Sequence, residues 1–128
     1  NCDNKGPTVV IARTSTGILI GGYASATWAG SGYTGDSSNF LFSLTNNFKH
    51  YWFQHGFYQY SHPSYAPTFG GGHDLFLGTS NVGNNPYCNI GYSYICRTGT
   101  YGSSTCRNDF CGTYNPILSE LEVFYKAP

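Results

Sequence analysis

Short apolar runs separated by turn residues are the feature that most restricts the fold of this 128-residue chain. The runs at residues 8–13 (TVVIAR) and 18–23 (ILIGGY) flank a Ser-Thr-Gly turn and predict a β-hairpin. No window keeps an apolar period of 3.6 residues, although Ser37 and Ser38 fit the start of one short helical turn. Several short strands between turn signals predict an all-β sandwich or barrel.

Further extended segments are expected at residues 39–44, 53–60, 74–77, 92–96 and 120–125. The run at 39–44 (NFLFSL) is apolar enough for a strand buried on nearly both faces. The stretch at 28–36 is rich in Gly and Ser and is expected to be a loop, and 81–86 is expected to be turn-rich. Because no repeat or linker interrupts the chain, residues 1–128 are treated as one domain.

The composition excludes several classes of partner. Charged residues are 9% of the chain, six acidic against six basic, so no basic surface for nucleic acid is expected. No apolar run approaches the roughly 20 residues that cross a bilayer, so membrane insertion is not expected either. The 18% aromatic content and the 17 glycines suit an all-β domain with tight turns. The chain has no methionine, and we therefore interpret it as a processed product whose signal peptide has been removed.

The cysteines favour disulfides over a zinc site. They are Cys2, Cys88, Cys96, Cys106 and Cys111, and only the last two approach the spacing of a zinc knuckle. We expect at least one disulfide among the last four, favouring Cys96 with Cys106 and then Cys88 with Cys111, although three pairings are open. Cys2 is then the odd cysteine, available for an intermolecular bond. Such usage is typical of secreted, extracellular proteins.

One block is conspicuous for its three consecutive glycines. It consists of Pro67, Thr68, Phe69, Gly70, Gly71, Gly72, His73 and Asp74. A phosphate loop would continue into Lys-Ser/Thr and a helix, and this block continues into a strand-like run. Adjacent residues of a strand point to opposite faces, so His73 and Asp74 should not share a catalytic site. We therefore interpret the block as structural, with His73 buried and donating to a backbone carbonyl.

Other polar residues give weaker signals. His50, His55 and His62 could in principle bind a metal, but their spacing matches no common ligand motif. Glu120 and Glu122 share one face of a strand, whereas glycoside hydrolysis needs carboxylates on facing elements. We expect them to be solvated or paired with Arg or Lys. No catalytic residue, metal or cofactor is predicted, and most aromatic side chains are expected to pack in the core.

The chain resembles the TLDc domain family. The most specific part of the resemblance is residues 64–75 (SYAPTFGGGHDL), which include the glycine block. Other matching blocks are residues 2–8, 21–23 with Trp28, 36–44, 112–114 and 120–124, in the family's order. The resemblance implies a two-sheet antiparallel β-sandwich with short helices and no established catalytic residues. It also implies relatives with roles in oxidation resistance or in binding the vacuolar proton ATPase.

Two departures from the family shape the functional expectation. The resemblance implies an opening element before Cys2, and the clustered cysteines are unlike those of cytosolic relatives. We expect a non-catalytic, extracellular binding or structural module that assembles with itself into a homo-oligomer, filament or surface layer. An edge left open by the missing element would be filled by a neighbour's strand. The alternatives are an oxidation-protective domain and a carbohydrate-binding module, and a protein or glycan partner is open.

Overall fold

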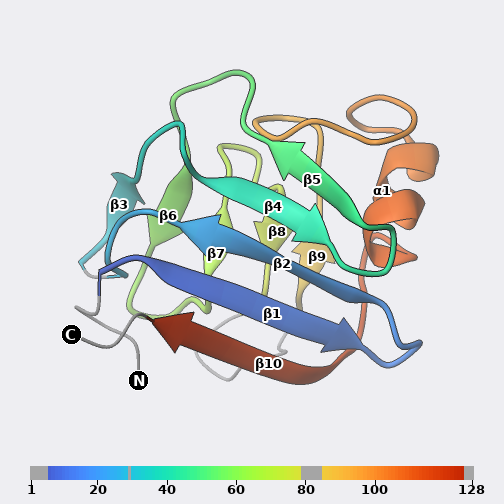
Figure 1. Cartoon of the computed structure of the whole chain (residues 1–128), viewed down its shortest axis with the longest axis horizontal. Coiled ribbons are helices and arrows are strands. Elements are labelled where there is room, and N and C mark those ends of the chain that lie inside the picture. Colours follow the sequence, from blue (N-terminus) through green and yellow to red (C-terminus); the bar gives the residue numbers. More distant parts are fainter. Residues whose placement is uncertain (1–5, 29, 79–84, 126–128) are drawn as a thin grey trace.

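The structure is a computed structural model that describes residues 6–28, 30–78 and 85–125, and it consists of two antiparallel sheets facing each other (Figure 1). The front sheet has the order β10-β1-β2-β4-β5 and the back sheet β3-β6-β7-β8-β9. The front strands are β1 (Thr8–Thr14), β2 (Leu19–Ala24), β4 (Phe40–Ser43), β5 (Phe48–Tyr51) and β10 (Leu118–Tyr125). The back strands are β3 (Gly32–Thr34), β6 (Gln59–Ser61), β7 (Thr68–Phe69), β8 (Leu75–Phe76) and β9 (Tyr87–Cys88). The two-sheet antiparallel sandwich predicted above is confirmed.

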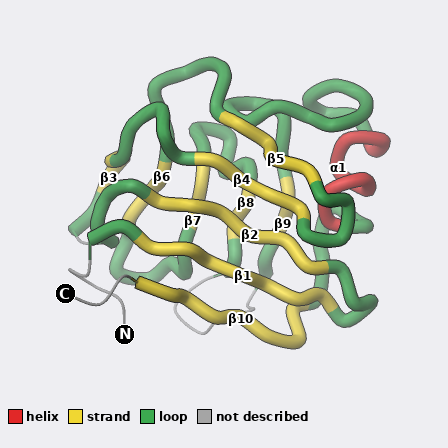
Figure 2. The backbone as a smooth tube through the Cα atoms, viewed as in Figure 1, coloured by secondary structure: helices red, strands yellow, loops and turns green. Residues whose placement is uncertain are grey.

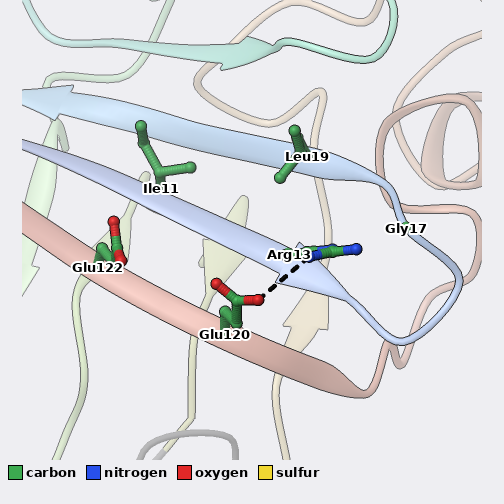
Figure 3. A pocket seen from close by; sticks show the side chains of 6 residues that line it. All are labelled: Ile11, Arg13, Gly17, Leu19, Glu120 and Glu122. Atoms are coloured by element: carbon green, nitrogen blue, oxygen red, sulfur yellow. Dashed lines mark hydrogen bonds and ion pairs between the residues drawn. The ribbon is translucent and has the colours of Figure 1, made fainter.

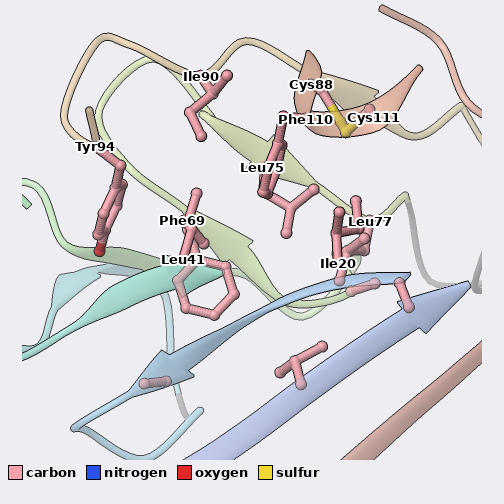
Figure 4. Packing of buried hydrophobic residues seen from close by; sticks show 14 of the residues in the cluster. Ile20, Leu41, Phe69, Leu75, Leu77, Cys88, Ile90, Tyr94, Phe110 and Cys111 are labelled. Atoms are coloured by element: carbon pink, nitrogen blue, oxygen red, sulfur yellow. A yellow bond between two sulfur atoms is a disulfide. The ribbon is translucent and has the colours of Figure 1, made fainter. Parts of the chain in front are cut away.

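The core lies between the two sheets (Figure 4). Val10, Ile20 and Leu41 point inward from the front sheet, and Phe69 and Leu75 face them from the back sheet, all without solvent exposure. Their burial follows from strand alternation, since β1 reads buried at every second residue. Each such side chain contributes about 1.5–3 kcal/mol of hydrophobic free energy, so this layer holds the sheets together.

The β1–β2 hairpin is the element that the sequence predicts best. The two strands pair antiparallel with Val10 opposite Gly22, and the chain turns at Gly17, whose φ is +91°. On its other side β1 pairs with β10, which the pattern at 120–125 predicted with a later start. The front sheet thus joins the first and last strands of the described chain.

Three strand expectations are corrected. The segment 28–36, expected to be a loop, contains β3, and β5 lies in a stretch for which no strand was expected. Residues 39–44 are not buried on both faces, because β4 alternates between half-buried and buried positions. Residues 92–96 form no strand and make only an isolated bridge from Tyr94 to Trp52. The expected turn-rich stretch 81–86 lies mostly outside the described residues.

The helix is at a different place from the predicted helical turn. Ser37 and Ser38 form a turn, closed by the Asn39 N–H donating to the Asp36 carbonyl at 3.1 Å. The described residues contain a single helix, α1 (Ser104–Cys111), capped by Ser103 and ended by left-handed Gly112 (Figure 2). Its buried residues are Cys106, Phe110 and Cys111. Eight residues give too few repeats for an apolar period to be visible in the sequence. No helix among the described residues is long and apolar enough to span a membrane.

Candidate functional site

The outer surface of the front sheet, called the front face here, carries many apolar and aromatic side chains. Its side chains are Val9, Ile11, Arg13, Leu19, Tyr23, Phe40, Phe42, Lys49, Tyr51, Glu120, Glu122 and Phe124. Soluble proteins usually place polar residues on the solvated side of an antiparallel sheet. A sheet face that keeps aromatic residues outward is typical of an interaction surface.

Register aligns these residues in rows across all five strands. One row runs Phe124, Val9, Tyr23, Phe40 and Tyr51, from β10 to β5. Its two ends are the most open, since Phe124 is 48% exposed and Tyr51 is 54% exposed. In the middle, the rings of Tyr23 and Phe40 stack with centroids 5.5 Å apart. This aromatic row is an apolar stripe as wide as the sheet.

The neighbouring row has a charge at each end and is called the charged row here. It runs Glu122, Ile11, Gly21, Phe42 and Lys49, again from β10 to β5. The Lys49 ammonium lies 4.4 Å from the centre of the Phe40 ring, a cation–π contact. The ion pairs among the described residues are Arg13 with Glu120 and Arg97 with Asp109. Neither Glu122 nor Lys49 therefore has an ion-pair partner within the described part of the chain.

A shallow depression lies at the β10 side of the front face (Figure 3). It is lined by Ile11, Arg13, Gly17, Leu19, Glu120 and Glu122. Arg13 and Glu120 pair at 3.1 Å with both side chains more than half exposed, so the pair contributes at most about 1 kcal/mol. Both lining carboxylates come from one strand, so the depression lacks the facing carboxylates of a glycosidase.

The glycine block forms a β-hairpin on the back sheet. β7 and β8 pair antiparallel with Phe69 opposite Leu75, and the turn closes when the His73 N–H donates to the Gly70 carbonyl at 3.1 Å. Gly70 has φ of +86° and His73 has φ of +51°, both in the left-handed region. The block thus contains β7 and the turn, and it leads directly into β8 and not into a helix.

His73 and Asp74 lie in different surroundings. The Asp74 carboxylate is fully buried, and its Oδ2 accepts the amide N–H groups of Ser93 and Tyr94 at 2.9 and 3.1 Å. His73 is half-buried, and its Nδ1 bonds the Tyr87 hydroxyl at 2.9 Å. The expected hydrogen bond from a buried His73 to a backbone carbonyl is therefore wrong. Its backbone leaves the strand conformation, which turns the ring outward onto the aromatic residues of the back sheet.

Asp74 makes the stability of the fold depend on pH. Burial raises the pKa of its carboxyl from 3.8 to about 6, against the lowering effect of the backbone N–H donors. Between these two values the folded protein binds the proton more tightly than the unfolded chain does. The contribution of Asp74 to the stability of the fold therefore falls as pH rises from about 4 to about 6. We expect the stability of wild type relative to Asp74→Asn to fall by about 2–3 kcal/mol between pH 4 and 7.

Urea unfolding at a series of pH values measures this difference. Asp36 supplies a control of opposite sign, because hydrogen bonds from Ser38 lower the pKa of its exposed carboxyl. Asp36→Asn should therefore lose stability relative to wild type as pH rises. A flat difference for Asp74→Asn would contradict the expected linkage.

The back sheet also places aromatic side chains on its outer surface. One residue from each strand forms the row Tyr33, Tyr60, Thr68, Phe76 and Tyr87. Tyr65 and His73 pack over this row. The ring centroids of Tyr65 and Phe76 are 5.1 Å apart, and those of His73 and Tyr60 are 5.5 Å apart. Thr68 and Phe76 are consequently buried, so the row is partly a second small core.

Arg107 marks one end of this aromatic cluster. Its guanidinium lies 4.4 Å from the centre of the Tyr114 ring, which stacks on Tyr87 at 5.5 Å. One terminal nitrogen donates to the Asn89 side-chain oxygen at 3.1 Å, and the buried Nε has no hydrogen-bond partner among the described residues. Arg107 is thus held by rings and an amide, with no carboxylate.

The three candidate histidines do not form a metal site. His50 is completely buried, donates from Nδ1 to the Ile95 carbonyl at 2.7 Å, and has its pKa lowered by burial. His55 is exposed and stacks on Tyr92, while His62 lies against Tyr65. Among the described residues, no three His, Cys, Asp or Glu side chains are grouped as metal ligands.

The clustered cysteines tie α1 to the back of the molecule. Cys88 lies beside Cys111 and Cys96 beside Cys106 at disulfide distance, with Cα–Cα separations of 6.5 and 5.6 Å. The pairs agree with those favoured from the sequence. Both fix the helix, one near each end, to segments next to the back sheet. Cys2 lies outside the described residues.

Sequence comparison agrees with this architecture. No curated protein matches the chain significantly. The family model for the TLDc domain matches residues 1–125, which is nearly the whole chain and includes both sheets and α1. The protein therefore belongs to the TLDc domain family.

Proposed function

We propose that this TLDc domain is a non-catalytic structural module that works outside the cell and associates with copies of itself through the front face. The observation that carries the proposal is the aromatic row, which extends from Phe124 to Tyr51 on an exposed surface. The two cysteine pairs support an oxidising compartment. The formal net charge of zero supports association because it removes long-range repulsion between copies.

The extent of the face sets the expected affinity. Five strands at about 4.8 Å and three outward rows at about 6.8 Å give a patch of roughly 20 by 20 Å. This is smaller than the roughly 800 Å² per partner of a standard stable interface. We therefore expect weak association, with a dissociation constant in the micromolar range. Most copies would then be associated only where the local concentration is high.

Tyr23→Lys tests the proposal at the centre of the aromatic row. Tyr23 points outward and is half-buried, so the fold should survive while the charge disrupts burial of the face. In sedimentation velocity from micromolar to millimolar concentration, wild type should shift above its 14.0 kDa chain mass and the variant should not. Tyr33→Lys, an outward tyrosine of the back sheet, is the matched control and should associate like wild type. A wild-type protein that stays monomeric throughout would refute the proposal.

Carbohydrate binding by the back sheet is a second candidate. Tyrosine and histidine rings offer flat apolar surfaces to the C–H face of a pyranose, and Arg107 supplies a cation without a carboxylate partner in the described chain. A glycan array tests this candidate, with Arg107→Met as the comparison.

An oxidation-protective role would require a reactive thiol. Four of the five cysteines lie at disulfide distance, which leaves Cys2 for that role.

A further inference from the structure

We infer that two copies associate front face to front face about a two-fold axis parallel to β2, with Glu122 of each copy pairing with Lys49 of the other. The inference rests on the proposed self-association and adds the arrangement and the residues that select it. It starts from the charged row, in which Glu122 and Lys49, neither with an ion-pair partner among the described residues, occupy opposite edges of one sheet.

The two charges cannot neutralise each other within one molecule. Glu122 is on β10 and Lys49 is on β5, the two outermost strands of a five-stranded sheet. Four strand spacings of about 4.8 Å place them roughly 19 Å apart, beyond the Debye length at physiological salt. Both side chains are exposed and point to the same side of the sheet. Opposite charges in this arrangement are complementary to a second copy.

A two-fold axis along the central strand satisfies both charges together. β2 is the middle strand, and a rotation about an axis parallel to it exchanges the β10 and β5 sides. The rotation brings Lys49 of one copy over Glu122 of the other, and the reverse pair forms by symmetry. Gly21 lies at the centre of the charged row and is covered by the ring of Phe42, and the rotation places Ile11 of one copy opposite Phe42 of the other.

The aromatic row obeys the same symmetry. The rotation places Phe124 opposite Tyr51, Val9 opposite Phe40, and the two copies of Tyr23 opposite each other. The exposed ends of the row thereby cover each other. Facing sheets pack about 10 Å apart, and the long Lys and Glu side chains can bridge that gap. The arrangement is closed, so front faces alone make a dimer.

Charge reversal tests the arrangement in the full-length chain. Lys49→Glu and Glu122→Lys each turn both symmetry-related pairs into like-charge contacts, so each variant alone should dimerise about tenfold more weakly than wild type. An equimolar mixture should restore the affinity, because a heterodimer contains two correct pairs. The double variant Lys49→Glu/Glu122→Lys should also restore it, to within about threefold of wild type.

A control separates geometry from net charge. Thr98→Glu/Thr100→Glu changes the net charge by the same amount as Lys49→Glu, at exposed positions outside the front sheet, and should dimerise like wild type. Sedimentation equilibrium gives the dissociation constants. If the charge variants dimerise like wild type while Tyr23→Lys stays monomeric, the two-fold arrangement is overturned and self-association through the front face stands. If wild type never exceeds the chain mass, the proposed function fails with it.

Discussion

Replacing Gly70 with alanine is expected to remove most of the stability of this domain, whereas the same change at Gly102 should cost only about 1 kcal/mol. The two glycines have nearly the same left-handed backbone, with φ of +86° and +84°, so both substitutions introduce the same local strain. They differ in their surroundings. A Cβ at Gly102 meets nothing within 4 Å, while a Cβ at Gly70 collides with the buried Asp74 carboxylate.

The collision is costly because Asp74 has nowhere to move. Its carboxylate accepts two backbone N–H groups from the segment that carries Tyr94, one of the largest buried side chains. Displacing a buried, hydrogen-bonded charge typically costs about 3–5 kcal/mol, a large part of the roughly 5–15 kcal/mol that stabilises a domain. Urea unfolding of Gly70→Ala and Gly102→Ala measures the two losses. Equal losses of unfolding free energy would mean that the turn between β7 and β8 tolerates a side chain at Gly70. They would also mean that contact with Asp74 does not determine the stability of this turn.

Removing both cysteine pairs is expected to leave the protein largely unfolded at 37 °C. The bonded residues are separated by 23 and 10 positions, and closing loops of those lengths stabilises a fold by about 3 kcal/mol each. The loss of both, about 6 kcal/mol, is comparable to the whole stability of a small domain. Far-UV circular dichroism with and without reductant measures the loss, and intact mass should rise by four hydrogens on reduction.

A double-mutant comparison identifies the connectivity. Cys88→Ser/Cys111→Ser should be no less stable than Cys88→Ser alone, because the first substitution already breaks the bond. Cys88→Ser/Cys96→Ser should show the summed losses of two separate bonds. If the stability losses of Cys88→Ser and Cys111→Ser were additive in the double variant, these two cysteines would not be bonded to each other.

The fold class was predictable because strand alternation and turn chemistry are local. Val10 and Ile20 lie in the two apolar runs that were predicted as strands, and the Ser-Thr-Gly turn between them identified the first hairpin. The apolar run that contains Leu41 did not reveal which of its side chains face inward. The helix was not predictable, because its buried residues are only Cys106, Phe110 and Cys111, and its position is held by cysteine pairs. β3 (GYT) and β5 (FKHY) were missed because neither contains an apolar run, and β3 lies in a stretch rich in Gly and Ser.

The candidate site was harder to predict from the sequence than the fold. Glu120 and Glu122 could be placed on one face from their spacing, and Glu120 does pair with an arginine. The rows of the front face require the register between strands that lie far apart in sequence. Nothing near Lys49 in the sequence indicates that it aligns with Glu122. The positive φ values in the glycine block are at Gly70 and His73, and the sequence alone could not identify these two positions, since only the complete turn determines which residue reverses the chain.

The pairing of β1 with β10 determines when the front face exists. Arg13 and Glu120, which face each other across these strands, are 107 positions apart. Contacts of such separation form late in folding, and β10 leaves the ribosome after the other described strands. A partial chain carries Lys49 and most of the aromatic row but lacks Glu122 and Phe124. The surface proposed for assembly is therefore completed only when β10 is synthesised and paired with β1, so growing chains cannot form the symmetric contact with one another before that step.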